Sequence, residues 1–141
     1  MITSDYFAKN IIKEEMLMNY YIEVMKKYAV FTGRARRKEF WMFTLIYTLI
    51  FIVLSVVDGI IGTGAMLFET GLLSGIFSLV SLCPSIAVTI RRLHDIDRSG
   101  WWILIGLVPI AGVIVLIIFA AKDGQPGSNQ YGSNPKEAAA A

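Results

Sequence analysis

The sequence predicts an all-α polytopic membrane protein, with three transmembrane helices preceded by an amphipathic interfacial helix. Residues 40–57, 70–90 and 99–121 contain no charged side chain. A hydrocarbon core about 30 Å thick needs roughly 20 apolar residues of helix, so each stretch is long enough to cross it. Hydrophobic residues make up 55% of the chain, and the mean hydropathy of +0.60 exceeds the usual balance of soluble proteins. The bilayer is therefore the solvent in which this 141-residue chain must be understood.

The segment before the first span divides into two parts. Residues 1–17 carry mixed charge with a weak apolar pattern, and we expect a dispensable extension or a short surface helix. Over residues 18–31, apolar side chains recur at spacings of three and four, which predicts an amphipathic helix lying in the membrane surface or packed on the spans. These side chains are Met18, Tyr21, Ile22, Met25 and Tyr28. The single membrane domain is expected to cover residues 18–135, with spans at about 40–57, 70–90 and 101–121.

Positive charge is concentrated beside the apolar stretches. Six of the thirteen Lys and Arg residues lie between positions 26 and 38, whereas residues 58–69 contain none. Clusters that border spans favour anionic lipid headgroups over nucleic acid, and they predict a cytoplasmic N-terminus with residues 58–69 on the opposite side. The residues expected to contact headgroups and set topology are Arg34, Arg36, Arg37, Lys38, Trp41, Trp101 and Trp102.

The third apolar stretch contains helix-breaking residues. Pro109 and Gly112 lie near its middle, where proline removes a backbone hydrogen bond and favours a kink. The polar tail at residues 122–141 is rich in turn-forming residues. Three crossings would place this tail outside, which we expect, whereas a bent or re-entrant third segment would return it to the cytoplasmic side.

The densest polar group joins the second and third spans. Its members are Arg91, Arg92, His94, Asp95 and Arg98. Arg91 and Asp95 are four residues apart, the spacing of an ion pair on a helix, and Asp95 is also placed to orient the His94 ring or to cap the next helix. We interpret the group as a structural clasp, with a proton-transfer pair or a headgroup site as the functional alternative.

Small residues line one face of the second span. Gly71, Gly75 and Ser78 recur at spacings of four and three, and glycine at such positions lets two helix backbones approach closely. The contact is expected either with another protomer or partner, or with the other spans of the same chain.

The sequence contains none of the usual catalytic motifs that we sought. It has no phosphate-binding loop of the Walker type, no Gly-x-Ser-x-Gly elbow and no His-Glu-x-x-His helix. One His and one Cys cannot supply the four ligands of a structural zinc site. No charged residue lies near the middle of a span, which disfavours a proton-coupled carrier. We therefore expect no catalytic residue, no metal, no cofactor, no nucleic-acid partner and no enzymatic activity.

Three blocks of the chain together resemble one family. They are Phe31-x-Gly33-Arg34-x-Arg36-Arg37-Lys38-Glu39-Phe40-Trp41, Arg91-Arg92-Leu93-His94-Asp95-x-x-Arg98-Ser99-x-Trp101-Trp102 and Gly127-x-Asn129-x-Tyr131-Gly132-x-Asn134-Pro135. In this order and separation they are similar to the YhaH-like family of small bacterial inner-membrane proteins, over residues 20–135. The resemblance implies an all-helical fold in the bacterial cytoplasmic membrane and supplies no activity.

The expected function is that of a structural or interaction component of the inner membrane, without a known biochemical activity. The alternative is an oligomeric small-solute permease or channel with Arg91, Arg92, His94 and Asp95 at its cytoplasmic mouth. A protein that binds or modifies lipid headgroups is the third hypothesis. The expected partners are a phospholipid bilayer with anionic headgroups and either a second copy of the chain or another membrane protein.

Overall fold

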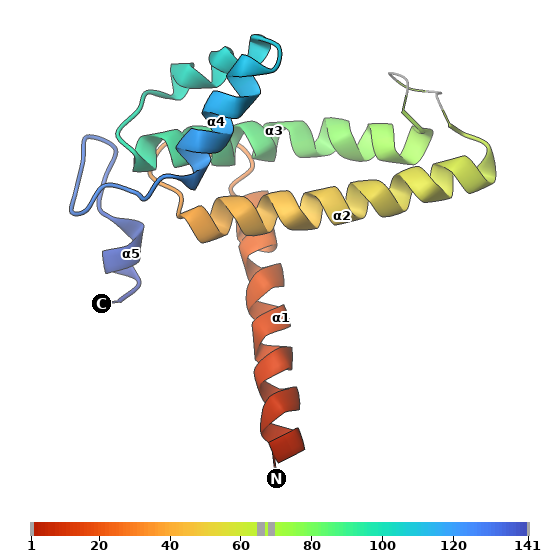
Figure 1. Cartoon of the computed structure of the whole chain (residues 1–141), viewed down its shortest axis with the longest axis horizontal. Coiled ribbons are helices and arrows are strands. Elements are labelled where there is room, and N and C mark those ends of the chain that lie inside the picture. The colour runs from red at the N-terminus through yellow and green to blue at the C-terminus, as the bar shows by residue number, and fades with distance from the viewer. Residues whose placement is uncertain (1, 65–66, 68–69, 141) are drawn as a thin grey trace.

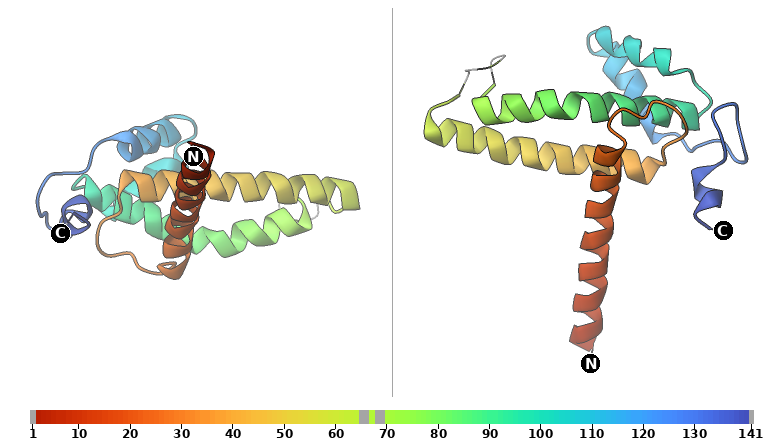
Figure 2. Two further views of the ribbon diagram at one scale, coloured as in Figure 1. Left: turned by 90° about the horizontal axis from the view of Figure 1, so that it is seen from below. Right: turned by 180° about the vertical axis from the view of Figure 1, so that it is seen from behind.

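The computed structural model describes residues 2–64, 67 and 70–140, and this part of the chain is all-α, as predicted. In chain order, its helices are α1 (Ile2–Lys26), α2 (Arg37–Ile61), α3 (Leu72–Asp95), the 3-10 helix η1 (Gly100–Leu107), α4 (Ala111–Ala121) and α5 (Pro135–Ala138). Helices α2 and α3 lie side by side and run in opposite directions (Figure 1). Helices η1 and α4 form a second, shorter pair near one end of α3 (Figures 1 and 2).

Helices α2 and α3 are each long and apolar enough to cross a bilayer. At 1.5 Å per residue they measure about 37 Å and 36 Å, more than the roughly 30 Å of a hydrocarbon core. They contain the predicted span at residues 40–57 and almost all of that at 70–90. Val53 and Val56 on α2 are more than half exposed. Such an apolar outer face is costly in water and favourable in lipid.

The predicted helix over residues 101–121 is wrong, because two short helices replace it. Pro109 has no N–H to continue a helix, and Ile110 adopts φ 65° and ψ −66°. The N–H of Ala111 donates to the carbonyl of Pro109 at 2.7 Å, so the chain reverses in a γ-turn. Helices η1 and α4 are each about 16 Å long, only half the thickness of the hydrocarbon core.

A glycine permits the close contact between η1 and α4. A Cβ atom added to Gly112 would lie 1.7 Å from the carbonyl oxygen of Ile105, so no larger residue fits while the hairpin keeps its shape. The sequence pattern of Pro109 and Gly112 indicated a kink. In the structure, the chain reverses its direction at this point instead of bending slightly (Figure 1).

Helix α1 differs from the sequence prediction at both ends. It begins at Ile2 and ends at Lys26, so residues 2–17 continue the helix expected over 18–31. It runs crosswise to α2 and α3 and projects away from them (Figure 1). Only its C-terminal part packs closely: Val24 is fully buried, and the Tyr21 ring stacks on Phe43 with centroids 5.4 Å apart.

A buried carboxylate joins α2 to α3 at the end far from the chain termini. The Asp58 side chain accepts hydrogen bonds from the backbone N–H groups of Leu73 and Ser74 at 3.0 and 2.9 Å. The hydroxyl groups of Ser74 and Thr63 also donate to it, at 2.8 and 2.7 Å. Asp58 therefore satisfies donors that a helix N-terminus leaves free, although it belongs to a different helix.

The small residues of α3 face other parts of this chain. A Cβ atom on Gly71 would lie 2.1 Å from the Asp58 carboxylate, and one on Gly75 would lie 2.8 Å from the Leu67 side chain. The Ser78 hydroxyl lies 3.5 Å from the Tyr47 hydroxyl on α2. The structure thus places this stripe against α2 and its adjoining loop.

Replacement of Gly112 by Ala tests the hairpin. We expect Gly112→Ala to force η1 and α4 apart and to lower the free energy of unfolding by about 1–3 kcal/mol, the usual cost of overpacking. Gly59→Ala is the matched control, because nothing lies within 4 Å of its added Cβ. Thermal unfolding in detergent measures both, and equal midpoints for the two variants would contradict the tight turn.

Candidate functional site: the arginine clasp

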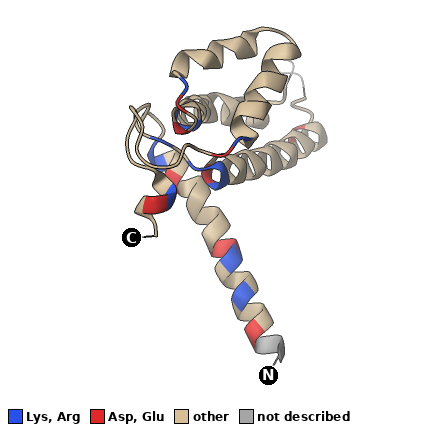
Figure 3. Cartoon of the chain, turned by 60° about the vertical axis from the view of Figure 1, so that its left-hand side comes forward, with Lys and Arg blue, Asp and Glu red and all other residues tan. Residues whose placement is uncertain are grey.

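Charged side chains gather where α3 ends and α2 begins, while the rest of α2 and α3 is almost free of charge (Figure 3). Five of these side chains form the group that we call the arginine clasp: Arg34, Glu39, Arg91, Arg92 and Asp95. All five are buried. Arg34 comes from the loop before α2, Glu39 from the first turn of α2, and the other three from the last turns of α3.

Asp95 lies between two guanidinium groups. Its Oδ1 atom accepts a hydrogen bond from Nε of Arg34 at 2.9 Å, and its Oδ2 atom accepts one from Nη1 of Arg92 at 2.5 Å. The three side chains are between 1% and 3% exposed. Charges this well buried are strongly coupled, because little water remains to screen them.

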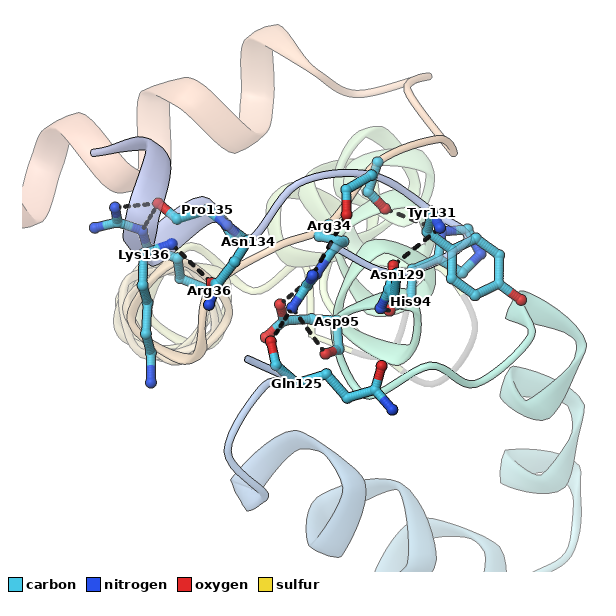
Figure 4. Close-up of polar contacts among 12 residues, drawn as sticks. Arg34, Arg36, His94, Asp95, Gln125, Asn129, Tyr131, Asn134, Pro135 and Lys136 are labelled. Carbon is cyan, nitrogen blue, oxygen red and sulfur yellow. Dashed lines mark hydrogen bonds and ion pairs between the residues drawn. The ribbon is translucent and has the colours of Figure 1, made fainter. Parts of the chain in front are cut away.

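The remaining donors of Arg34 bind backbone carbonyls of the C-terminal tail. Its Nη2 atom donates to Gln125 at 2.6 Å, and its Nη1 atom donates to Gly127 at 2.8 Å (Figure 4). The backbone N–H of Gln125 in turn donates to the carbonyl of Asp95 at 2.8 Å. Arg34 therefore fastens the tail to the end of α3.

Arg92 binds the end of α4 in the same way. Its Nε atom donates to the carbonyl of Ala120 at 3.1 Å, and its Nη2 atom donates to the carbonyl of Lys122. These two acceptors are among the carbonyls that a helix C-terminus leaves without a partner within the helix. Arg92 thus caps α4 from another helix and holds the returning arm of the hairpin.

A second ion pair attaches α2 to α3. Nη1 of Arg91 donates to Oε1 of Glu39 at 2.6 Å, and the Arg91 carbonyl accepts from the N–H of Ala35 at 2.9 Å. The predicted pair between Arg91 and Asp95 is therefore wrong. Spacing within one helix cannot reveal that Glu39 and Arg34 approach from other segments and take these two partners.

His94 serves as a packing surface and a link to the loop before α2. Its ring stacks on that of Tyr131, with centroids 3.9 Å apart, and its Nδ1 atom lies 3.0 Å from the Gly33 carbonyl oxygen. Because a carbonyl only accepts, Nδ1 is the donor. The His94 backbone carbonyl accepts from the Asn129 side chain at 2.9 Å (Figure 4). Asp95 does not orient the His94 ring, contrary to one sequence-based interpretation.

The residues predicted to contact headgroups separate into different environments. Arg34 is buried in the clasp, so its prediction as a headgroup contact is wrong. Arg36 donates to the Pro135 carbonyl, Arg37 forms an ion pair with Asp123 at 2.9 Å, and Lys38 is exposed. On η1, Trp101 is 78% exposed.

Trp41, Trp102 and Arg98, which the sequence also predicts as functional residues, lie beside the clasp. Trp41 on α2 is half-buried. The guanidinium of Arg98 lies 5.1 Å from the Trp102 ring centroid and 5.5 Å from that of Phe119, a cation–π arrangement that links the loop after α3 to both arms of the hairpin. The Ser99 hydroxyl accepts from the N–H of Trp101 and caps η1.

Sequence reasoning missed the partners that the tail supplies. Asn129 and Tyr131 bind His94, and the buried Asn134 caps α5 through the N–H of Lys136 at 3.0 Å. The composition of the tail predicts turns and no contact with the clasp. The available signal is the third block of the family resemblance, which contains Asn129, Tyr131 and Asn134.

Residues 28–133 match the family described as "Protein of unknown function (DUF805)". The chain belongs to this family. The match covers the clasp, α2, α3, the hairpin and most of the tail, and it begins after the end of α1. The resemblance inferred from the three sequence blocks is confirmed.

Three relatives come from Escherichia coli (strain K12). Inner membrane protein YhaI is 45% identical over 119 residues, which cover 84% of this chain and 97% of YhaI. Inner membrane protein YhaH is 43% identical over 119 residues, covering 84% of this chain and 98% of YhaH. Uncharacterized protein YiiR is 29% identical over 133 residues, covering 76% of this chain and 86% of YiiR. No solved structure matches the chain. The names of YhaI and YhaH and the apolar helices agree with an inner-membrane protein, and they indicate no biochemical activity.

The clasp predicts a large difference between two neighbouring aspartates. Asp95→Asn should lower the free energy of unfolding by about 3–5 kcal/mol, because it leaves two buried guanidinium groups without a counter-charge. Asp97→Asn removes the same charge at an exposed position and should change it by less than about 0.5 kcal/mol. Unfolding in detergent compares the two. A stable Asp95→Asn protein would refute the structural importance of the clasp.

Proposed function

We propose that this chain is a non-catalytic structural and interaction component of the bacterial cytoplasmic membrane. In this proposal it crosses the bilayer twice, through α2 and α3, and both termini face the cytoplasm. Helices η1 and α4 enter the bilayer from the cytoplasmic side and return to it. The single observation that carries the proposal is the attachment of the tail to the arginine clasp.

The tail attachment supports two crossings instead of three. Arg34 binds the tail and also binds Asp95 at the end of α3. Residues before α2, the last turn of α3 and the tail therefore lie at one end of the helix pair. A third complete crossing would separate the tail from Arg34 by the thickness of the hydrocarbon core, about 30 Å. The predicted outward tail is incompatible with these contacts.

The charge distribution supports the cytoplasmic orientation. The end that carries the clasp also carries Arg36, Arg37 and Lys38, whereas residues 58–69 at the other end contain no Lys or Arg. Bacterial membrane proteins retain Lys and Arg in their cytoplasmic loops. This rule supports a cytoplasmic position for the N-terminus, the clasp and the tail.

The apex of the hairpin suits the hydrocarbon core. Leu107 and Ile110 are about 80% exposed. Irregular backbone is costly in lipid unless its polar groups are paired, and here the N–H groups of Val108, Ala111 and Gly112 all bond within the turn. Pro109 has no N–H to satisfy. An exposed apolar turn in which these three N–H groups are paired supports a re-entrant segment.

Helix α1 supplies a surface in the plane of the membrane. It lies crosswise to α2 and α3, and its exposed apolar side chains include Phe7, Ile11, Met18 and Ile22. These four positions share one face of the helix, the arrangement of an interfacial anchor. The family match begins at residue 28, so α1 lies outside the part of the chain that defines the family.

Most of the buried polar groups are bonded in a way that favours a structural role, whereas Nε and Nη2 of Arg91 and the Ser81 hydroxyl have no hydrogen-bond partner among the described residues. In the clasp, the guanidinium groups of Arg34 and Arg92 and both Asp95 oxygens bond to parts of the chain itself. At the other end, Asp58 bonds to Ser74 and Thr63. Groups engaged in this way hold helices together and are not free to bind a solute or to transfer protons.

Cysteine labelling in intact cells tests the topology. In a Cys83→Ser background, which removes the single native cysteine, we expect Gly64→Cys to react with a membrane-impermeant maleimide added outside. Ser128→Cys in the tail should react only after the membrane is opened. Labelling of both positions from outside would show that residues 99–121 cross the bilayer completely, and it would refute the re-entrant hairpin.

A further inference from the structure

A cationic groove lies beside the clasp, at the start of α2. Its volume is about 520 Å³, and it is lined by Arg36, Arg37, Lys38, Trp41, Asp123 and Lys136, among others. Four of these side chains are cations and one is a carboxylate. The groove therefore carries an excess of positive charge next to an aromatic ring, outside the buried network of Arg34, Arg92 and Asp95.

A single carboxylate holds two of the cations at the groove. Oδ1 of Asp123 accepts from Nη1 of Arg37 at 2.9 Å and from Nζ of Lys136 at 3.3 Å. The Arg37 and Lys136 side chains are 42% and 53% exposed, so their other donors remain accessible. Hydrogen bonds from both hold the pKa of Asp123 below its usual range, which keeps the carboxylate ionised. Two partly exposed cations are thus fixed close together, and Lys38 adds a third charge.

An apolar groove adjoins the cationic one. It has a volume of about 300 Å³ and lies between α2, α3 and α4, where Phe40, Val113, Leu116 and Ile117 contribute to its lining. Trp41 lines both grooves, so they meet at its ring. A cationic groove that continues into an apolar one matches a molecule with an anionic head and a hydrocarbon chain.

We propose that these grooves bind one anionic phospholipid. Its phosphate lies among Arg37, Lys38 and Lys136, and an acyl chain passes Trp41 into the groove between α2 and α4. This inference rests on the proposed function, which puts the start of α2 at the cytoplasmic headgroup layer. Tryptophan and lysine side chains are stable in that layer. Inorganic phosphate shares the chemistry of the headgroup but has no chain to fill the apolar groove.

Tryptophan quenching tests the site directly. In a Trp101→Phe, Trp102→Phe background, Trp41 is the only tryptophan and reports on the groove. The full chain in neutral detergent micelles is titrated with phosphatidylglycerol or phosphatidylcholine that carries bromine on the acyl chain. We expect phosphatidylglycerol to quench Trp41 at a clearly lower mole fraction than phosphatidylcholine does. An excess of inorganic phosphate should leave that preference in place.

Two variants with opposite effects make the test independent of folding. Arg37→Ala with Lys136→Ala should weaken the phosphatidylglycerol preference about fivefold for each cation removed, whereas Asp123→Asn should strengthen it about fivefold. The matched control removes two exposed cations outside the groove, Lys26→Ala with Lys27→Ala, and should leave the preference unchanged.

Three results would overturn the proposal. They are equal quenching by both lipids, equal weakening by the control pair, and displacement of phosphatidylglycerol by inorganic phosphate, which would indicate a free-anion site. Micelles have no sides, so the outcome does not depend on topology. A lost lipid preference with the expected cysteine labelling would refute the lipid site alone, and inverted labelling with intact preference would refute the proposed orientation alone.

Discussion

The ion pairs that Asp95 makes with Arg34 and Arg92 connect nearly every part of this structure. They join the loop before α2 to the end of α3, and the remaining donors of the two arginines extend the connection to α4 and to the tail. Removing one partner from a buried charge network costs several kcal/mol, because the other charges stay buried without compensation. Moving any one of these segments away would therefore leave buried charges on the others unpaired, and this free-energy cost holds the segments together.

The path of the third apolar stretch follows from this constraint. A straight helix over residues 101–121 would place its two ends about 30 Å apart. The carbonyl of Ala120 must nevertheless reach Arg92, which lies one turn before Asp95 on α3. The chain meets this requirement by reversing at Pro109 and Ile110, and Gly112 allows the two arms to pack together. The clasp thus fixes the C-terminal end of α4, and the turn at Pro109 and Ile110 fixes the apex, so both favour the same hairpin.

The sequence predicts those features that depend on composition over a whole segment. Spans α2 and α3 follow from the absence of charge, and the clustering of Arg and Lys at one end follows from their positions in the chain. Hydropathy indicates that residues 99–121 are apolar, but it does not distinguish a straight helix from a hairpin. Helical spacing detects pairs within one helix, so it suggested Arg91 with Asp95 and missed Glu39 and the tail carbonyls, which come from distant segments. The sequence does not predict the full length of α1, because residues 2–17 mix charged side chains with the few apolar positions, such as Phe7 and Ile11, that extend the face of Met18 and Ile22.

Arginines only a few residues apart carry different roles, because backbone conformation separates them. Arg34 precedes α2, in the loop that passes beside α3, and its side chain turns into the clasp. Arg37 is the first residue of α2, and its side chain reaches outward to Asp123 at the surface. Neutralising the whole run from Arg34 to Lys38 would therefore combine a loss of folding energy with a loss of surface charge. Separate substitution of Arg34 and of Arg37 with Lys38 resolves the two effects: the first should unfold the clasp and free the tail, and the second should spare stability and change only contacts with anionic lipid.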